Sequence, residues 1–193
     1  MCAEDNIQVV NATTAAQYFH VLRRQLHRDI RKPLVIFTPK APLRMKESRS
    51  HIDEFTSGSF HEVLDDPRVT DKASVKRIVL CSGKVAHDAM SERDKRGAAV
   101  AVVRVEQLYP FPIDQINEVL ATYPNAKEIV WLQEEPENMG PWHFVEHLIW
   151  RVKQRGFDLR HVARVPSGSP ATGSKAIHDQ ELADLMDETF ADL

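Results

Sequence analysis

The regular alternation of short apolar runs with helical patterns after residue 77 constrains the fold most. Each of four runs is rich in β-branched or aromatic residues and has the length of a buried strand, and a helical pattern follows each one. The four runs are residues 78–81, 100–105, 129–132 and 159–165. Four strand–helix units in succession predict an α/β fold with a doubly wound, mostly parallel sheet and helices on both faces.

The helices between these strands are predicted from their apolar positions. They cover residues 85–96, a segment that ends at Tyr123, a segment from Pro141 to about Arg155, and the carboxyl-terminal segment. In the last of them we expect four side chains to face inward: Ile177, Leu182, Leu185 and Met186.

The first 45 residues contain too few elements for a domain of their own. Residues 7–10 read as a strand, Thr13 and Thr14 can cap a helix that runs to Leu26, and residues 34–37 form a second strand. We therefore expect residues 1–45 to be the end of an α/β domain that lies upstream. Residues 46–76 are polar with weak periodicity and predict an interdomain connection packed on its neighbours, while residues 77–193 form the carboxyl-terminal domain.

Composition excludes several functional classes. The formal net charge of −3 gives no attraction to nucleic acid or to an anionic membrane surface. Two cysteines make neither a disulfide framework nor a metal knuckle, and no apolar run approaches the roughly 20 residues of a membrane span. We expect a soluble protein of a reducing, cytoplasmic compartment.

Residues 143–147 match H-x-x-E-H, an inverted zinc-peptidase pattern. Two histidines four residues apart on a helix can bind one zinc ion, with the glutamate as general base. However, the apolar stripe of that helix is expected to be Val145, Leu148, Ile149 and Val152. His143 and His147 would then lie on the opposite, solvated side, which argues against a zinc hydrolase.

Polar groups follow each predicted strand, at the edge of the sheet where ligands of such folds bind. Glu134 and Glu135 are adjacent and point to opposite faces, so one carboxylate is expected to turn inward toward backbone amides or a partner's basic group. Residues 82–84 lack the spacing of a phosphate loop and favour a glycine turn with a serine helix cap. Residues 167–174 could bind an anion or form a simple connection.

Basic residues gather at the end of the first predicted helix. Arg23, Arg24, His27 and Arg28 lie in its last turns, and Arg31 and Lys32 follow. The cluster can be a solvated helix end stabilised by the helix dipole, or it can be an anion site.

Five stretches together resemble the carboxyl-terminal region of the 2-oxoglutarate dehydrogenase family. They are residues 33–40, 81–84, 103–112, 131–142 and 169–174. The resemblance implies a transketolase-like carboxyl-terminal domain preceded by the end of a pyrimidine-binding domain. It also implies oxidative decarboxylation of 2-oxoglutarate in the tricarboxylic acid cycle, with thiamine diphosphate and magnesium as cofactors. The implied partners are the upstream domains, a second subunit of a homodimer and a lipoyl-bearing succinyltransferase.

The catalytic groups of that family are expected outside this chain. The Gly-Asp-Gly motif that would hold the metal and diphosphate does not occur in it, so the resemblance implies a noncatalytic piece. It further suggests an acetyl-CoA or nucleotide effector site at the domain junction, with Arg24, Lys32 and Gln107 as candidate ligands. A free-standing regulatory domain that binds a nucleotide or a partner remains the alternative.

Overall fold

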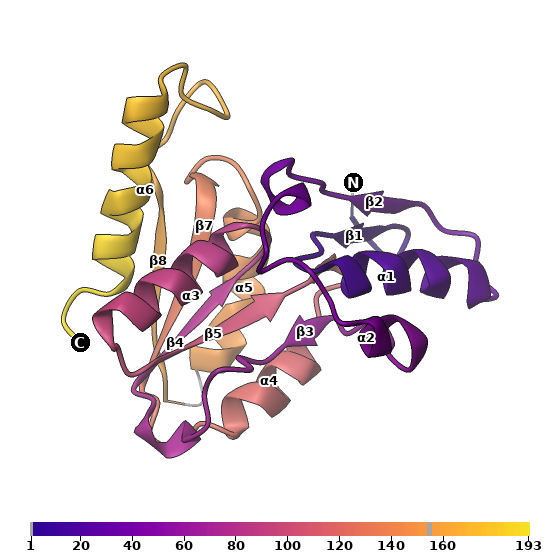
Figure 1. The fold of residues 1–193 in the computed structure, drawn as a ribbon, viewed down its shortest axis with the longest axis horizontal. Helices are drawn as coiled ribbons and strands as arrows, with labels where there is room; N and C mark the ends of the chain where they lie inside the picture. Colours follow the sequence, from indigo (N-terminus) through magenta and orange to yellow (C-terminus); the bar gives the residue numbers. More distant parts are fainter. Residues whose placement is uncertain (1, 154–155) are drawn as a thin grey trace.

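The computed structural model describes residues 2–153 and 156–193, and of residues 151–153 it describes the backbone alone. The larger of its two sheets has the strand order β3-β5-β4-β7-β8 (Figure 1). Strands β4, β5, β7 and β8 run parallel, and β3 pairs with β5 in the antiparallel sense. The bounds are β3 Val63–Leu64, β4 Arg77–Cys81, β5 Val100–Val105, β7 Glu128–Pro136 and β8 Asp158–Arg164. The predicted mostly parallel sheet is confirmed.

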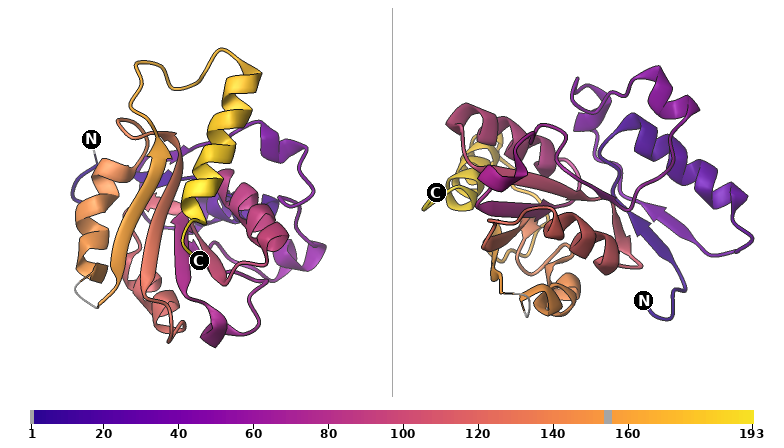
Figure 2. Two further views of the ribbon diagram at one scale, coloured as in Figure 1. Left: turned by 90° about the vertical axis from the view of Figure 1, so that its left-hand side faces the viewer. Right: turned by 90° about the horizontal axis from the view of Figure 1, so that it is seen from below.

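Helices cover both faces of this sheet (Figure 2). On one face α4 (Ile113–Ala121) and α5 (Trp142–Lys153) pack their apolar side chains on alternate strand residues such as Leu80 and Trp131. On the other face α3 (Val85–Arg96) and α6 (Lys175–Thr189) pack on the intervening residues. Because successive strand residues point to opposite faces, each buried strand contributes to both cores. The prediction of a doubly wound sheet is confirmed.

A second, three-stranded sheet has the order β2-β1-β6. Strands β1 (Gln8–Val10) and β2 (Leu34–Ile36) are parallel and flank α1 (Ala15–His27) in sequence, as the early pattern predicts. The strand predicted over residues 100–105 ends where expected, but the strand that follows it was not predicted. Gln107–Tyr109 forms β6, which leaves the large sheet and pairs with β1 in the antiparallel sense.

The turn between β5 and β6 is fixed by a buried carboxylate. Glu106 is fully buried and accepts hydrogen bonds from Thr13, from the backbone N at 2.8 Å and from Oγ1. Burial raises the pKa of this carboxyl, and the hydrogen bonds from Thr13 oppose the shift. This contact directs the chain from one sheet into the other.

The polar segment 46–76 packs on its neighbours and also supplies the edge strand β3. The segment contains α2 (Ile52–Thr56) and the short 3₁₀ helix η2 (Lys72–Ser74), and a second 3₁₀ helix, η1 (Ala41–Leu43), precedes it. Asp66, whose side chain is buried, pairs with Arg93 of α3 and accepts a hydrogen bond from Val102 N at 2.8 Å. Polar long-range pairs of this kind leave no periodic signal in the sequence, which is why the strand was not predicted.

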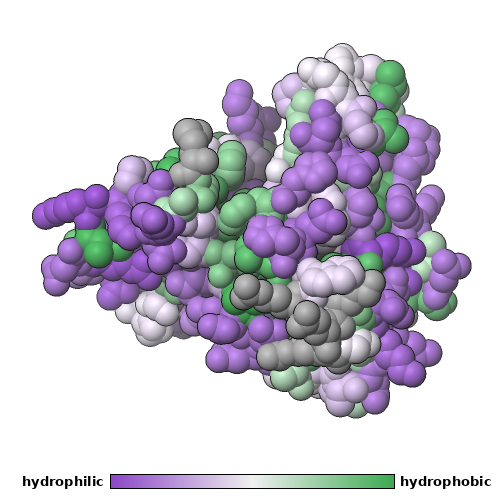
Figure 3. Space-filling model, turned by 180° about the vertical axis from the view of Figure 1, so that it is seen from behind, coloured by the Kyte–Doolittle hydropathy of each residue, from purple (hydrophilic) through white to green (hydrophobic). Residues whose placement is uncertain are grey.

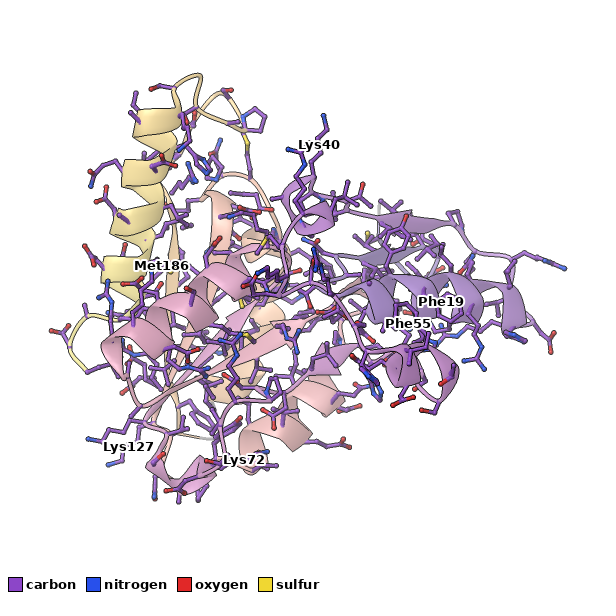
Figure 4. All side chains as sticks on the ribbon, in the orientation of Figure 1. Phe19, Lys40, Phe55, Lys72, Lys127 and Met186 are labelled. Atoms are coloured by element: carbon purple, nitrogen blue, oxygen red, sulfur yellow. The ribbon has the colours of Figure 1, made fainter. Side chains whose placement is uncertain are left out.

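Helix α1 leaves much of its apolar surface exposed. Its inner face consists of Ala16, Gln17, His20 and Val21, whereas Leu26 on its outer face is 85% exposed. Figure 4 shows Phe19 beside Phe55 of α2, with ring centroids 5.7 Å apart, and Phe19 is still 44% exposed. On the opposite side of the molecule, apolar surface also gathers near the middle of the face that Figure 3 shows. An apolar face of this kind marks a contact surface.

In α6, Leu185 and Met186 are buried as expected and Leu182 is partly buried against the same core, but Ile177, in the first turn, is 54% exposed. Helix α5 is described to Lys153, so its predicted end at Arg155 and the Val152 side chain lie outside the described residues. Along the described chain, no helix combines the length and the apolar composition that crossing a membrane requires.

Candidate functional site

Arg24 lies at a polar junction between the two sheets. Its guanidinium donates to Glu62 Oε1 at 2.7 Å, to Gln8 Oε1 at 2.9 Å and to Gln107 Oε1 at 2.7 Å. It also lies 4.2 Å from the ring centroid of Phe60. Burial, and next the like charge of Arg28, lower the pKa of Arg24 to about 10, so it remains a cation at neutral pH. The structure thus brings together two of the three predicted ligands, Arg24 and Gln107.

Lys32 does not join them. It lies in the loop between α1 and β2, and only its carbonyl is held, by Gln25 Nε2 at 2.7 Å. Gln25 in turn accepts from Gln8 Nε2 at 3.1 Å, so Lys32 is linked to Arg24 only through two glutamines. Any anion at this junction would have to compete with Glu62 for Arg24.

The H-x-x-E-H motif lies on α5 with its polar residues outward. His143, Glu146 and His147 are exposed, while Val145 and Ile149 are fully buried, as the helical pattern predicts. Within residues 2–153 and 156–193, no group of three or more His, Cys, Asp or Glu side chains is placed to hold a metal ion.

The turn after β4 differs in part from its prediction. Gly83 has a φ of +74°, which confirms a glycine turn. However, α3 is capped by Lys84 without a side-chain hydrogen bond, so the predicted serine cap is wrong. Ser82 instead lines a pocket, and its hydroxyl is enclosed and has no hydrogen-bond partner in the described part of the chain.

Gln133 organises the loop that follows β7. Its Oε1 accepts from Trp131 Nε1 at 3.3 Å and from Trp142 N at 3.1 Å. Its Nε2 donates to the carbonyls of Pro136 at 3.2 Å and Met139 at 2.9 Å. One buried amide therefore determines where the loop runs, a role that the sequence pattern did not reveal.

The loop of residues 167–174 is tied to the same region. Asn138 Nδ2 donates to Ser167 O and its Oδ1 accepts from Ser167 N, each at 2.9 Å. This paired contact supports the simpler of the two predictions for that loop, a structured connection.

Glu135 lines a pocket of about 420 Å³ at the carboxyl edge of the large sheet. Strand β5 lies on one side of β4 and β7 on the other, so the crevice above β4 and β7 is the topological switch point of the sheet. Burial, followed by the neighbouring charge of Glu134, raises the pKa of the Glu135 carboxyl. The pocket lies between this edge and the small sheet, since Val9 of β1 and Tyr109 of β6 also line it.

Known proteins match the chain along its whole length. The sequence model described as 2-oxoglutarate dehydrogenase C-terminal matches residues 49–190. The chain belongs to this family. A second model, the transketolase pyrimidine binding domain, matches residues 1–46 of this 2-oxoglutarate dehydrogenase family member.

Curated relatives agree with the family assignment. The 2-oxoglutarate dehydrogenase E1 component of Cupriavidus necator is 45% identical over 100% of the chain and 20% of its own length. The proteins of the same description from Azotobacter vinelandii and Brucella anthropi are each 44% identical over 98% of the chain, covering 21% and 20% of their lengths. The chain therefore spans about a fifth of the length of these relatives.

Proposed function

We propose that this chain serves as the carboxyl-terminal part of a 2-oxoglutarate dehydrogenase first component and is itself noncatalytic. The observation that carries the proposal is the match of two adjacent segments to two consecutive parts of such enzymes, at 45% identity over the whole chain. Residues 1–45 are then the end of the pyrimidine-binding domain, residues 46–76 the connection, and residues 77–193 the carboxyl-terminal domain.

The proposed reaction of the complete enzyme is oxidative decarboxylation of 2-oxoglutarate in the tricarboxylic acid cycle. Thiamine diphosphate and magnesium supply the chemistry from sites that this chain does not contribute. The succinyl group passes to a lipoyl-bearing succinyltransferase, and the enzyme works as a cytoplasmic homodimer. The exposed apolar face of α1 supports a contact role, because Phe19 and Leu22 are each 44% exposed and Leu26 is 85% exposed.

Reconstitution tests this assignment. The chain alone, with thiamine diphosphate, magnesium and 2-oxoglutarate, is expected to release no carbon dioxide above background. Adding the separately expressed remainder of a family enzyme that lacks this region should restore decarboxylation. Turnover by the chain alone would refute the noncatalytic role, and failure to restore activity despite binding would refute the contact role.

We propose as a second function an effector site for acetyl-CoA or a nucleotide at the junction of Arg24 and Gln107, with Lys32 outside the junction in the loop between α1 and β2. The contact between Arg24 and Gln107 at 2.7 Å supports it, since these groups converge from separate segments. Glu62 occupies the Arg24 guanidinium, so Glu62→Gln should strengthen binding and Arg24→Ala should abolish it. Calorimetry with acetyl-CoA and AMP measures this binding. If neither wild type nor Glu62→Gln gives a heat of binding, the effector-site proposal is refuted.

A further inference from the structure

The pocket above β4 and β7, at the switch point of the large sheet, has no part in the proposed function. Its walls include four aromatic side chains, Phe37, Tyr109, Trp131 and Phe144. The Tyr109 and Phe144 rings meet edge to face with centroids 5.8 Å apart. Aromatic faces carry negative electrostatic potential, so several of them around one space favour a cation.

The same pocket contains one carboxylate and no basic side chain. Of its lining residues only Glu135 belongs to the charged types, and within the described chain Glu135 forms no ion pair. The positive charge of Arg164 acts on Glu135 from outside the pocket, and Arg164 is itself paired with Glu181. A carboxylate held in a partly apolar site without a counter-ion favours the arrival of a positive group.

Two residues of the pocket wall each have an enclosed side-chain oxygen that lacks a partner among the described residues. Asn11 Oδ1 and Ser82 Oγ are buried from solvent and have no hydrogen-bond partner among the described residues. Both oxygens can accept a hydrogen bond, but a ligand reaches them only after a rotation of the Asn11 or Ser82 side chain. Glu135 is therefore the acceptor on which the site depends.

We propose that this pocket binds an organic cation, an ammonium or guanidinium group on a small apolar body, with Glu135 as its counter-ion. The apolar body lies against Leu108 and the aromatic rings, while the charged end faces Glu135. The cation is either a free small amine or the tip of a basic side chain from another part of the longer enzyme. This site is separate from the Arg24 junction, where the positive charge belongs to the protein.

The experiment titrates the chain with benzylamine and with its neutral analogue benzyl alcohol, observed through the indole N–H resonance of Trp131. Wild type should bind the ammonium form about tenfold tighter than the alcohol. Glu135→Gln should remove that difference, whereas the matched control Glu134→Gln, whose side chain does not line the pocket, should keep it. Phe144→Leu keeps an apolar wall but removes an aromatic ring, so it should weaken the binding of benzylamine and leave the binding of benzyl alcohol unchanged.

Equal binding of the cation and the alcohol to wild type, or no binding of either, would overturn the proposal. Retention of the preference in Glu135→Gln would overturn it too. A second titration uses a family enzyme that carries this sequence with its preceding domains. Binding of benzylamine to the longer enzyme supports a free amine as ligand. Binding to the isolated chain but not to the longer enzyme supports a pocket that a basic side chain of that enzyme fills.

Discussion

Arg24 and Gln107 lie 83 residues apart in sequence, yet a hydrogen bond of 2.7 Å joins them. Arg24 comes from α1, in the segment that matches the pyrimidine binding domain, and Gln107 comes from β6, in the segment that matches the carboxyl-terminal family. The two segments are thus held by side chains here and by the backbone pairing of β1 with β6. Mutations at this junction should affect how the segments hold together.

Arg24→Ala should destabilise the chain. The Arg24 and Glu62 side chains are 12% and 22% exposed, so the variant leaves a largely buried carboxylate with only the more distant Arg28, at 3.9 Å, as its cation among the described residues. We expect a loss of about 2 kcal/mol in the free energy of unfolding, after allowance for partial solvent screening. Urea unfolding measures it. Arg23→Ala is the control, since Arg23 makes only an exposed contact with Gly58 O at 3.4 Å, and equal losses would contradict the role assigned to Arg24.

Gly83→Ala should cost more stability than Gly97→Ala. Both glycines have positive φ, +74° and +61°, so each substitution carries a backbone cost of about 1 kcal/mol. A Cβ at Gly83 would lie 2.3 Å from Asn11 Nδ2, whereas a Cβ at Gly97 meets nothing within 4 Å. The double variant Gly83→Ala/Asn11→Ala should recover the excess in thermal unfolding. If the double variant does not recover stability, the clash with Asn11 is not the source of the excess loss in Gly83→Ala.

Gln133→Ala should release the loop that links β7 to α5. The variant removes an amide that contacts the backbone of Pro136, Met139 and Trp142, and buried groups left unpaired cost about 1–3 kcal/mol each before relaxation. Hydrogen exchange should speed up in residues 134–142 while the strands of the large sheet stay protected. Gln180→Ala, which loses one exposed contact to Asp184, is the control and should leave exchange unchanged.

Glu135→Gln should change how stability depends on pH. The folded pKa of Glu135 is raised by burial, so the folded state holds its proton more tightly than the unfolded state, where the value is about 4.3. Wild type therefore loses stability as pH rises from that value through the raised folded pKa. Relative to wild type, Glu135→Gln should gain stability over this window, as urea midpoints at several pH values will show. A gain of the same size and pH profile in Glu134→Gln would contradict the assignment to Glu135.

Local pattern was sufficient for the order of the main elements. Residues 78–81, 100–105 and 129–132 are apolar at every or nearly every position, which indicates strands buried on both faces, and the structure has β4, β5 and β7 there. The outward side of α5 was also predictable, because 3.6-residue periodicity places His143 and His147 opposite Val145 and Ile149. Both features depend on neighbours in sequence.

The sequence by itself determined the α/β class, the mostly parallel sheet of the main units and the family to which the chain belongs. Only the tertiary structure decided that Gln107–Tyr109 crosses into a second sheet, that Glu62 occupies Arg24, and that Gln133 holds the loop beside Glu135. The physical reason is the separation in sequence. Hydrophobic periodicity is visible among neighbouring residues, whereas two polar side chains that meet across many residues produce no periodic pattern. The pocket around Glu135 exists because the two sheets meet there, and its lining residues come from segments far apart in the sequence.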